Sequence, residues 1–335
     1  MNHQQTVEPT LNDASDLAEI LAAEYRYSPL FKDDVYAKEM LVHIARTVLK
    51  DTGQDERFSL RIDGVLSGVI SRRVRLNGSF GCRVTDLFIA LLPNVPAVLH
   101  WARSILGAMD WHVEHTIVGR ISAYHQYLLP VLADLGVGID AVGLVSSTDS
   151  ALNRLRSHYE LPEDFRGLGL RHTVMEPGDL DEVIELRRRA FTLAPQYCWF
   201  GAQPAHLEFQ YQRLEKDLAG NHAWWVIRND QKLVGTFGSS ITMENPMWGP
   251  VGGMELIFDT GYVSKGMSKI AYALTLSKLA QEGCSVFKGI TAQAPVMHLG
   301  KIMGRALFDI HLRGPSDFEP THFSLYLHTP VCTLE

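Results

Sequence analysis

The sequence predicts an α/β protein made of two tandem copies of one domain, each a mixed and mostly antiparallel sheet flanked by helices. The chain has 335 residues, which is more than one small domain usually contains and suggests two domains. Helix and strand periodicities alternate in the same order through both halves. In addition, Ile121-Ser122-Ala123 stands before a helix pattern that ends at Leu135-Gly136, and Ile290-Thr291-Ala292 stands before one that ends at Met303-Gly304. A repeat of this size indicates two domain copies rather than a solenoid of short units.

The first half begins with two predicted helices, at residues 14–25 and 34–51, because apolar residues recur there every three or four positions. Residues 58–62 and 65–74 alternate in polarity and predict a hairpin across Asp63-Gly64. The remaining pattern gives a strand at 83–91, a helix at 95–109, a strand at 116–124, a helix at 126–135 and a strand at 141–146.

The second half repeats this order. A strand at 170–174 leads to a helix at 180–191, whose start is marked by Glu176-Pro177-Gly178-Asp179. The other predicted elements are a helix at 204–218, a hairpin of 223–227 with 233–242, a strand at 254–258, a helix at 267–282, a strand at 284–292, a helix at 296–303 and closing strands at 308–313 and 323–328. We therefore divide the chain into a first domain at 1–148, a linker containing a helix at 149–168, and a second domain at 169–335.

The turn at residues 259–266 stands out because it joins a strand directly to a long helix. The start of that helix leaves several backbone N–H groups without partners at the positive end of the helix dipole. Such a site suits a phosphate or pyrophosphate. Gly266 lets the backbone approach closely, and Ser264, Lys265 and Ser268 add donors around it.

The order of elements along nearly all of the chain resembles the GNAT acyltransferase superfamily. Val263-Ser264-Lys265-Gly266-Met267-Ser268 lies where that family has its pyrophosphate turn. Gly266 matches the first glycine of the family motif, whereas Val263 replaces a basic or amide residue and Ser268 replaces the last small residue. The segment 297–304 resembles the closing helix of the family.

The resemblance implies an N-acyltransferase, in the first instance an acetyltransferase, that moves an acyl group from acyl-coenzyme A to the amine of a small molecule. No metal is implied. The pantetheine arm would lie between the strands 254–258 and 286–292, and a backbone amide near Ile257 or Phe258 would bond the acyl carbonyl. The residues expected to bind coenzyme A are Ile257, Phe258, Val263, Ser264, Lys265, Gly266, Met267, Ser268 and Gln293.

The first half departs from this pattern at the equivalent turn, Leu91-Leu92-Pro93-Asn94-Val95-Pro96. It has no glycine, and its two prolines remove two backbone donors. Pro96 still suits a helix start. We interpret the first domain as a degenerate copy that packs on the second and shapes the acceptor pocket.

Glu255 and His298 are the predicted catalytic residues. Glu255 lies in the strand beside the donor cleft, where the family often has a glutamate base, and an apolar strand would raise its pKa. The alternative is a glutamate on an exposed face, or one paired with Arg or Lys. Many family members use a tyrosine acid where this chain has Gly300, and His298 is the nearest titratable residue. The alternative for His298 is a packing or surface role.

Aromatic residues gather at Tyr197, Trp199, Phe200 and Trp225. In the family, the loop between the first two helices borders the acceptor site, so these side chains are predicted to line a pocket for the acceptor. An interdomain core is the equal alternative.

Charge and cysteine content limit the kinds of partner and metal site that the sequence predicts. The net charge is −7, and the cationic run Arg187-Arg188-Arg189 fits a solvated helix face better than an RNA contact. An aminoacyl-tRNA or carrier-protein donor on the same fold stays open, as does a non-catalytic ligand sensor. The four scattered cysteines form no metal-binding spacing. No secretory signal or membrane span is recognised, so a cytoplasmic protein is expected, and a homodimer is compatible with this interpretation.

Overall fold

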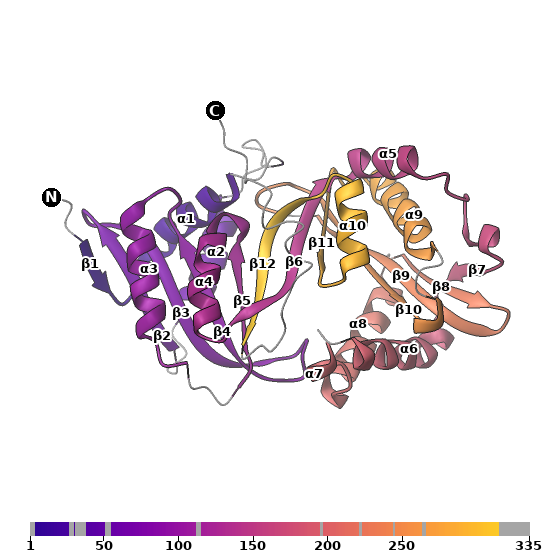
Figure 1. The fold of residues 1–335 in the computed structure, drawn as a ribbon, viewed down its shortest axis with the longest axis horizontal. Helices are drawn as coiled ribbons and strands as arrows, with labels where there is room; N and C mark the ends of the chain where they lie inside the picture. The colour runs from indigo at the N-terminus through magenta and orange to yellow at the C-terminus, as the bar shows by residue number, and fades with distance from the viewer. Residues whose placement is uncertain are drawn as a thin grey trace.

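The computed structural model describes residues 4–26, 30, 38–50, 55–111, 115–194, 197–220, 223–243, 245–262 and 266–314. Within these ranges all twelve strands belong to one sheet, in the order β1-β2-β3-β4-β5-β12-β6-β11-β10-β9-β8-β7. Figure 1 shows the two halves of the chain side by side along this sheet. The sequence did not predict this continuity between the halves.

The strands of the first half are β1 (Gln4–Val7), β2 (Asp55–Ile62), β3 (Val65–Asn77), β4 (Cys82–Leu91), β5 (Ile117–Ser122) and β6 (Gly138–Ser147). Its helices are α1 (Ala14–Arg26), α2 (Lys38–Leu49), α3 (Pro96–Ala108) and α4 (Leu129–Asp134). Short 3-10 turns lie at Leu11–Asp13 and Ala123–Leu128. The sequence did not predict β1, an edge strand paired antiparallel with β2.

The strands of the second half are β7 (Arg171–Val174), β8 (Trp224–Asn229), β9 (Lys232–Thr242), β10 (Val251–Phe258), β11 (Val286–Thr291) and β12 (Ala306–Gly314). Its helices are α5 (Thr148–His158), α6 (Leu180–Leu193), α7 (Cys198–Gly201), α8 (Pro204–Ala219), α9 (Met267–Gln281) and α10 (Ala294–Ile302). Short 3-10 turns lie at Phe165–Leu168, Pro177–Asp179 and Thr260–Tyr262. The predicted strand at 323–328 lies outside the described residues.

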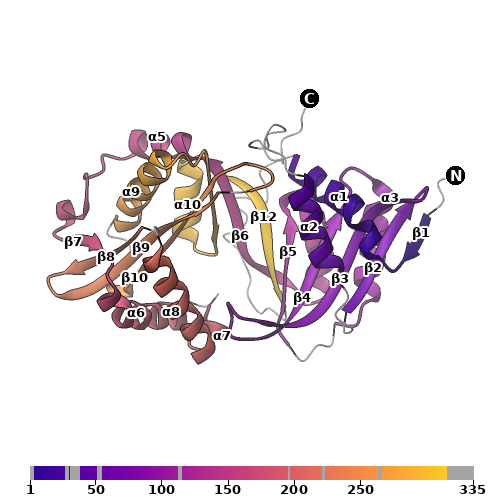
Figure 2. The same cartoon turned by 180° about the vertical axis from the view of Figure 1, so that it is seen from behind.

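Helices cover both faces of the sheet. In the first half, α3 and α4 lie over one face in Figure 1, and α1 and α2 over the other face in Figure 2. In the second half, α6 and α8 pack on one face against residues such as Trp224, Val226 and Ile257. On the opposite face, α5, α9 and α10 bury residues such as Leu276, Phe287 and Leu299. The apolar stripes of these helices are removed from water by the sheet, which drives the packing.

The two halves exchange their last described strands. β6 follows α4 of the first half but pairs antiparallel with β11 of the second half. In return, β12 follows α10 of the second half and pairs antiparallel with β5 of the first half. β6 and β12 also pair with each other at the centre of the sheet. Each exchanged strand covers an edge that would otherwise expose unpaired N–H and C=O groups. Separating the halves would therefore break three ladders.

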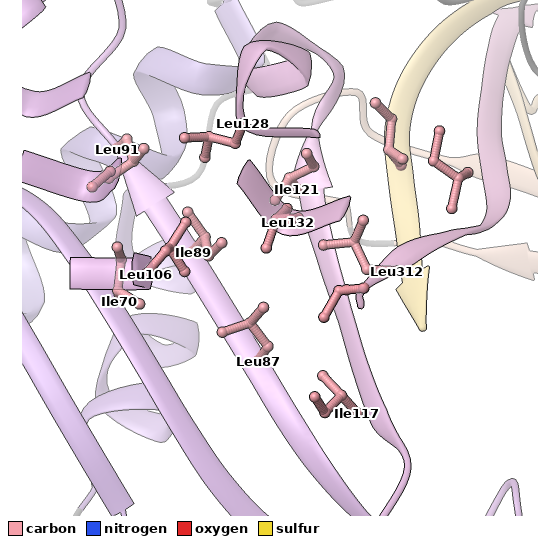
Figure 3. Close-up of a cluster of buried hydrophobic side chains, with 14 of the residues drawn as sticks. Ile70, Leu87, Ile89, Leu91, Leu106, Ile117, Ile121, Leu128, Leu132 and Leu312 are labelled. Atoms are coloured by element: carbon pink, nitrogen blue, oxygen red, sulfur yellow. The ribbon is translucent and has the colours of Figure 1, made fainter. Parts of the chain in front are cut away.

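The core of the first half includes side chains from the exchanged strand. Figure 3 shows Leu312 of β12 beside Leu132 and Ile121, in a cluster that extends to Leu87 and Leu106. Leu312 is 2% exposed. The first half thus depends on a residue of the second half to complete its core.

A cluster of charges around the buried Asp309 also joins the halves at β12. The Asp309 carboxylate lies 3.5 Å from Nη1 of Arg120 on β5 and 3.4 Å from Nζ of Lys288 on β11. His311 lies within 3.2 Å of the same carboxylate. Burial raises the pKa of Asp309, but the hydrogen bond from His311 and the charges of Lys288 and Arg120 outweigh it, so the net shift is well below the usual range. Asp309 therefore stays ionised where the two halves meet.

Candidate active site

A cavity opens where two parallel strands of the second half separate. β10 and β11 pair from Val251 with Val286 to Gly253 with Lys288, and no further. β10 continues beside β9 to Phe258, whereas β11 continues beside β6. The cavity has a volume of about 820 Å³ and is lined by residues 254–258 of β10 and by the starts of α9 and α10.

The backbone of β10 turns two N–H groups toward this gap. The N–H of Asp259 donates to the Val234 carbonyl at 2.9 Å. Donors alternate along an antiparallel ladder, so the N–H of Ile257 faces β9, whereas those of Phe258 and Leu256 face the cavity. An acyl carbonyl in the cavity would therefore meet the amide of Phe258 or Leu256 rather than that of Ile257.

The first turn of α9 forms one end of the cavity. Gly266 has φ of +80° and Met267 begins the helix. Gly266, Met267, Ser268 and Lys269 all line the cavity. The first N–H groups of a helix have no acceptor inside it, so they are available to an anion. The predicted donors Val263, Ser264 and Lys265 lie outside the described residues.

Gln293 and His298 also line the cavity. Gln293 precedes α10, and His298 is an exposed residue of that helix. Gly300, which takes the position of the family's tyrosine acid, is buried. His298 and Glu255 therefore border the same cavity, with His298 on its solvent-facing side.

Glu255 is held by two arginines. Nη1 of Arg187 on α6 and Nη2 of Arg213 on α8 each donate to one of its carboxylate oxygens. Gln210 Oε1 accepts from Arg187 Nη1 at 2.8 Å. Burial raises the pKa of Glu255, but the two guanidinium groups outweigh it and the net shift is downward. The expected raised pKa is thus wrong, because the strand faces α6 and α8 arginines rather than apolar side chains alone.

The prediction that the run Arg187-Arg188-Arg189 is a solvated helix face is wrong for its first member. Arg187 is completely buried, and its guanidinium lies 5.2 Å from the Trp224 ring centroid. Arg188 pairs with Glu185 on the surface, as expected for the run. One sequence signal pointed to Arg187, since it lies four residues after the buried Val183 on the apolar stripe of α6.

The predicted aromatic pocket divides into two groups. Tyr197 and Phe200 line the cavity. Burial raises the pKa of Tyr197 to about 12, so its hydroxyl stays protonated at neutral pH. Trp225 instead stacks on Phe237 with ring centroids 4.9 Å apart. Trp199 lies 4.9 Å from the ring of Phe80. Neither tryptophan is among the residues that line the cavity.

The first half contributes a wall of this cavity through hairpin residues that the sequence analysis did not single out. β3 and β4 extend to a hairpin tip whose Ser79 and Phe80 line the cavity of the second half. A Cβ on Gly81 would lie 2.5 Å from the backbone N of His206, so the tip packs tightly on the start of α8. His206 itself lines the cavity, and its Nδ1 bonds the Ser79 carbonyl. No local sequence pattern pairs residues this far apart in the chain.

At the equivalent position of the first half, a side chain of the same half bonds the strand amide. The N–H of Leu92 donates to the Ser67 carbonyl at 2.9 Å, as the N–H of Asp259 donates to the Val234 carbonyl in the second half. Leu91 is therefore the counterpart of Phe258. The Leu91 N–H donates to the Glu24 carboxylate at 2.9 Å. The same carboxylate lies 2.8 Å from Nε2 of the buried His125. An internal carboxylate thus bonds the amide that is turned toward a cavity in the second half.

Neither a membrane span nor a metal cluster emerges from the part of the chain that the structure describes. No helix there is long and apolar enough to cross a membrane. No group of three or more His, Cys, Asp or Glu side chains is arranged to hold a metal ion there.

Comparisons with known proteins identify the fold. No protein-family model and no curated protein matches the sequence. Among solved structures, a GCN5-related N-acetyltransferase from Sphaerobacter thermophilus has a TM-score of 0.56 at 14% identity, covering 92% of this chain and 94% of that chain. A GNAT-family acetyltransferase from Colwellia psychrerythraea has a TM-score of 0.51 at 11% identity, covering 93% and 98%. The glucosamine N-acetyltransferase region of a fungal multi-domain GH3 β-N-acetylglucosaminidase has a TM-score of 0.52 at 11% identity, covering 93% of this chain and 38% of that chain. The predicted fold is confirmed as that of GNAT N-acetyltransferases.

Proposed function

We propose that the protein is an N-acyltransferase that moves an acetyl group from acetyl-coenzyme A to the amine of a small molecule. The observation that supports this most strongly is the separation of β10 from β11, with cavity-facing amides at one edge and a helix start at the end. A thioester arm fits such a gap, since its carbonyl can take a hydrogen bond from the Phe258 or Leu256 amide. That bond would strengthen as negative charge develops on the carbonyl oxygen during acyl transfer.

The pyrophosphate of coenzyme A would lie on the first turn of α9, around Gly266 and Ser268, where free N–H groups and the helix dipole favour an anion. The Nζ of Lys269 lies 3.8 Å from the centroid of the Tyr159 ring, and both residues line the cavity. A cation at this place adds attraction for the phosphates of the donor.

The acceptor amine would enter from the side formed by Tyr197, Phe200 and the hairpin tip at Ser79 and Phe80. In this proposal residues 169–335 hold the donor site, and residues 1–148 close part of the acceptor side. The reaction would take place in the cytoplasm, where acetyl-coenzyme A is available.

Thiol release measures this activity directly. Purified protein is incubated with acetyl-coenzyme A and a panel of primary amines, including polyamines, amino sugars, amino acids and arylamines, and the acetylated product is identified by mass spectrometry. We expect one class of amine to raise thiol release well above the rate of thioester hydrolysis. Release that no amine raises, combined with transfer from an aminoacyl-tRNA or an acyl carrier protein, would replace this proposal with the alternative donor.

A further inference from the structure

We propose that His206 is the general base of the acyl transfer and takes the proton from the acceptor amine at its Nε2 atom. This inference rests on the proposed function and assigns a residue role within the same cavity. The three observations that support it are the contact at Nδ1, the state of Nε2 and the charges around the ring.

The contact at Nδ1 fixes the tautomer. Nδ1 of His206 lies within hydrogen-bond distance of the backbone carbonyl of Ser79. A carbonyl can only accept, so Nδ1 must carry the hydrogen. The neutral imidazole then has its lone pair on Nε2. The ring is also fixed in place, because it lies between Phe200 and Phe191, with centroid distances of 4.8 Å and 5.6 Å.

Nε2 is a buried acceptor without a partner among the described residues. The residue is 2% exposed, yet it borders the cavity. A buried polar atom left without a hydrogen bond costs about 1–3 kcal/mol. An N–H group of a bound amine would supply the missing bond, and the fold would thus hold the acceptor nitrogen beside a base.

The charges around His206 favour its neutral form. Burial is the main cause that lowers its pKa, and the cations Arg187 of α6 and Arg213 of α8 act in the same direction. The bond to Ser79 and the charge of Glu255 on β10 oppose this, but the net shift is downward. His206 is therefore neutral at pH 7 and able to accept a proton. Glu255 is less suited to that task, because both of its oxygens are bonded to arginines.

The resulting step balances without a further reactant. The neutral amine attacks the thioester carbonyl carbon and forms the C–N bond, which leaves the nitrogen with one extra proton. Nε2 of His206 takes that proton. The C–S bond then breaks with its electron pair on sulfur, and the imidazolium returns the proton to the thiolate. The products are the amide and free coenzyme A.

Two variants of His206 separate the base role from the orienting contact. His206→Asn keeps an N–H donor near the position of Nδ1 and removes Nε2, whereas His206→Gln keeps a polar atom near Nε2 without its basicity. With the amine that gives thiol release, we expect kcat to fall about 100-fold or more in both, as for loss of a general base. The KM for acetyl-coenzyme A should stay within about twofold, and the acidic limb of the kcat/KM profile should disappear. His100→Asn, at an exposed position of α3 outside the cavity, is the matched control and should keep that limb. Wild-type kcat with an unchanged acidic limb in His206→Asn would overturn the proposal.

An NMR measurement tests the same inference without turnover. In protein labelled with ¹⁵N at histidine, the resonance absent from His206→Asn should show protonated Nδ1 and unprotonated Nε2 at pH 7. An Nε2–H tautomer, or a cationic ring at that pH, would overturn the base role. Turnover that survives in His206→Asn counts against the base role alone, whereas absence of turnover with every acceptor and donor counts against the proposed function as well.

Discussion

The backbone N–H of Leu91 donates to the carboxylate of Glu24 at 2.9 Å, and this bond distinguishes the two halves of the protein. Phe258, the counterpart of Leu91, turns its N–H toward an open cavity. The strand amide is therefore bonded by an internal side chain in the first half, whereas its counterpart in the second half faces the cavity.

Replacing Glu24 with alanine should destabilise the first half without affecting the donor site. The change leaves the Leu91 N–H and the Nε2 atom of His125 unpaired in the core, at a cost of about 1–3 kcal/mol for each buried group. Urea unfolding measures the loss. Glu19→Ala is the control on the same helix, because Glu19 forms a half-exposed ion pair with Lys38 that is worth about 0–1 kcal/mol. Equal losses in the two variants would contradict the assigned role of Glu24.

Replacing Glu255 with glutamine should reduce stability while keeping the acidic limb of the activity profile. The buried Arg187 would lose its counter-ion, and we expect a loss of about 2–3 kcal/mol. Because the folded-state pKa of Glu255 is lowered, its stabilisation is present above its usual pKa of about 4.3 and is lost as the pH falls below it. Glu215→Gln, at an exposed position of α8, is the control. A profile that loses its acidic limb in Glu255→Gln would return Glu255 to the role of base.

Replacing Asp309 with asparagine should make stability less sensitive to acid. The folded-state pKa of Asp309 lies below the unfolded one, so its contribution is complete above about pH 4 and is lost as the pH falls further. The midpoint temperature of thermal unfolding should therefore fall more steeply below pH 4 for the wild type than for Asp309→Asn. At pH 7 the variant should be less stable than the wild type by about 1–3 kcal/mol. Asp230→Asn, at the exposed turn between β8 and β9, is the control. If the unfolding midpoints of the wild type and Asp309→Asn fell in parallel below pH 4, the charges around Asp309 would not stabilise the junction of the two halves.

Local periodicity predicted most of the elements, because helix and strand patterns depend on residues close in sequence. It also predicted the turn at Gly266 before a long helix and the position of Glu255 in the strand beside the cavity. The exchange of β6 and β12 was not predicted, since either strand satisfies its alternation beside any partner. The state of Glu255 was missed for a similar reason, as Arg187 and Arg213 come from helices distant in the chain. His206 depends on Ser79 of the other half, and no pattern within one half indicates that contact.

In the proposed function each chain has one donor site, at the start of α9. The measurement that tests this site is calorimetric titration of acetyl-coenzyme A into the wild type, Gly266→Val and Gly283→Val. Both glycines flank α9 with φ of +80° and +79°, and neither has an atom within 4 Å of a Cβ position, so both variants should lose similar stability from the strained backbone. We predict one site per chain and an affinity at least about tenfold weaker in Gly266→Val alone, from losing one charge-assisted hydrogen bond or more. Two sites per chain, or equal affinity in the wild type and Gly266→Val, would show that the start of α9 is not the single donor site.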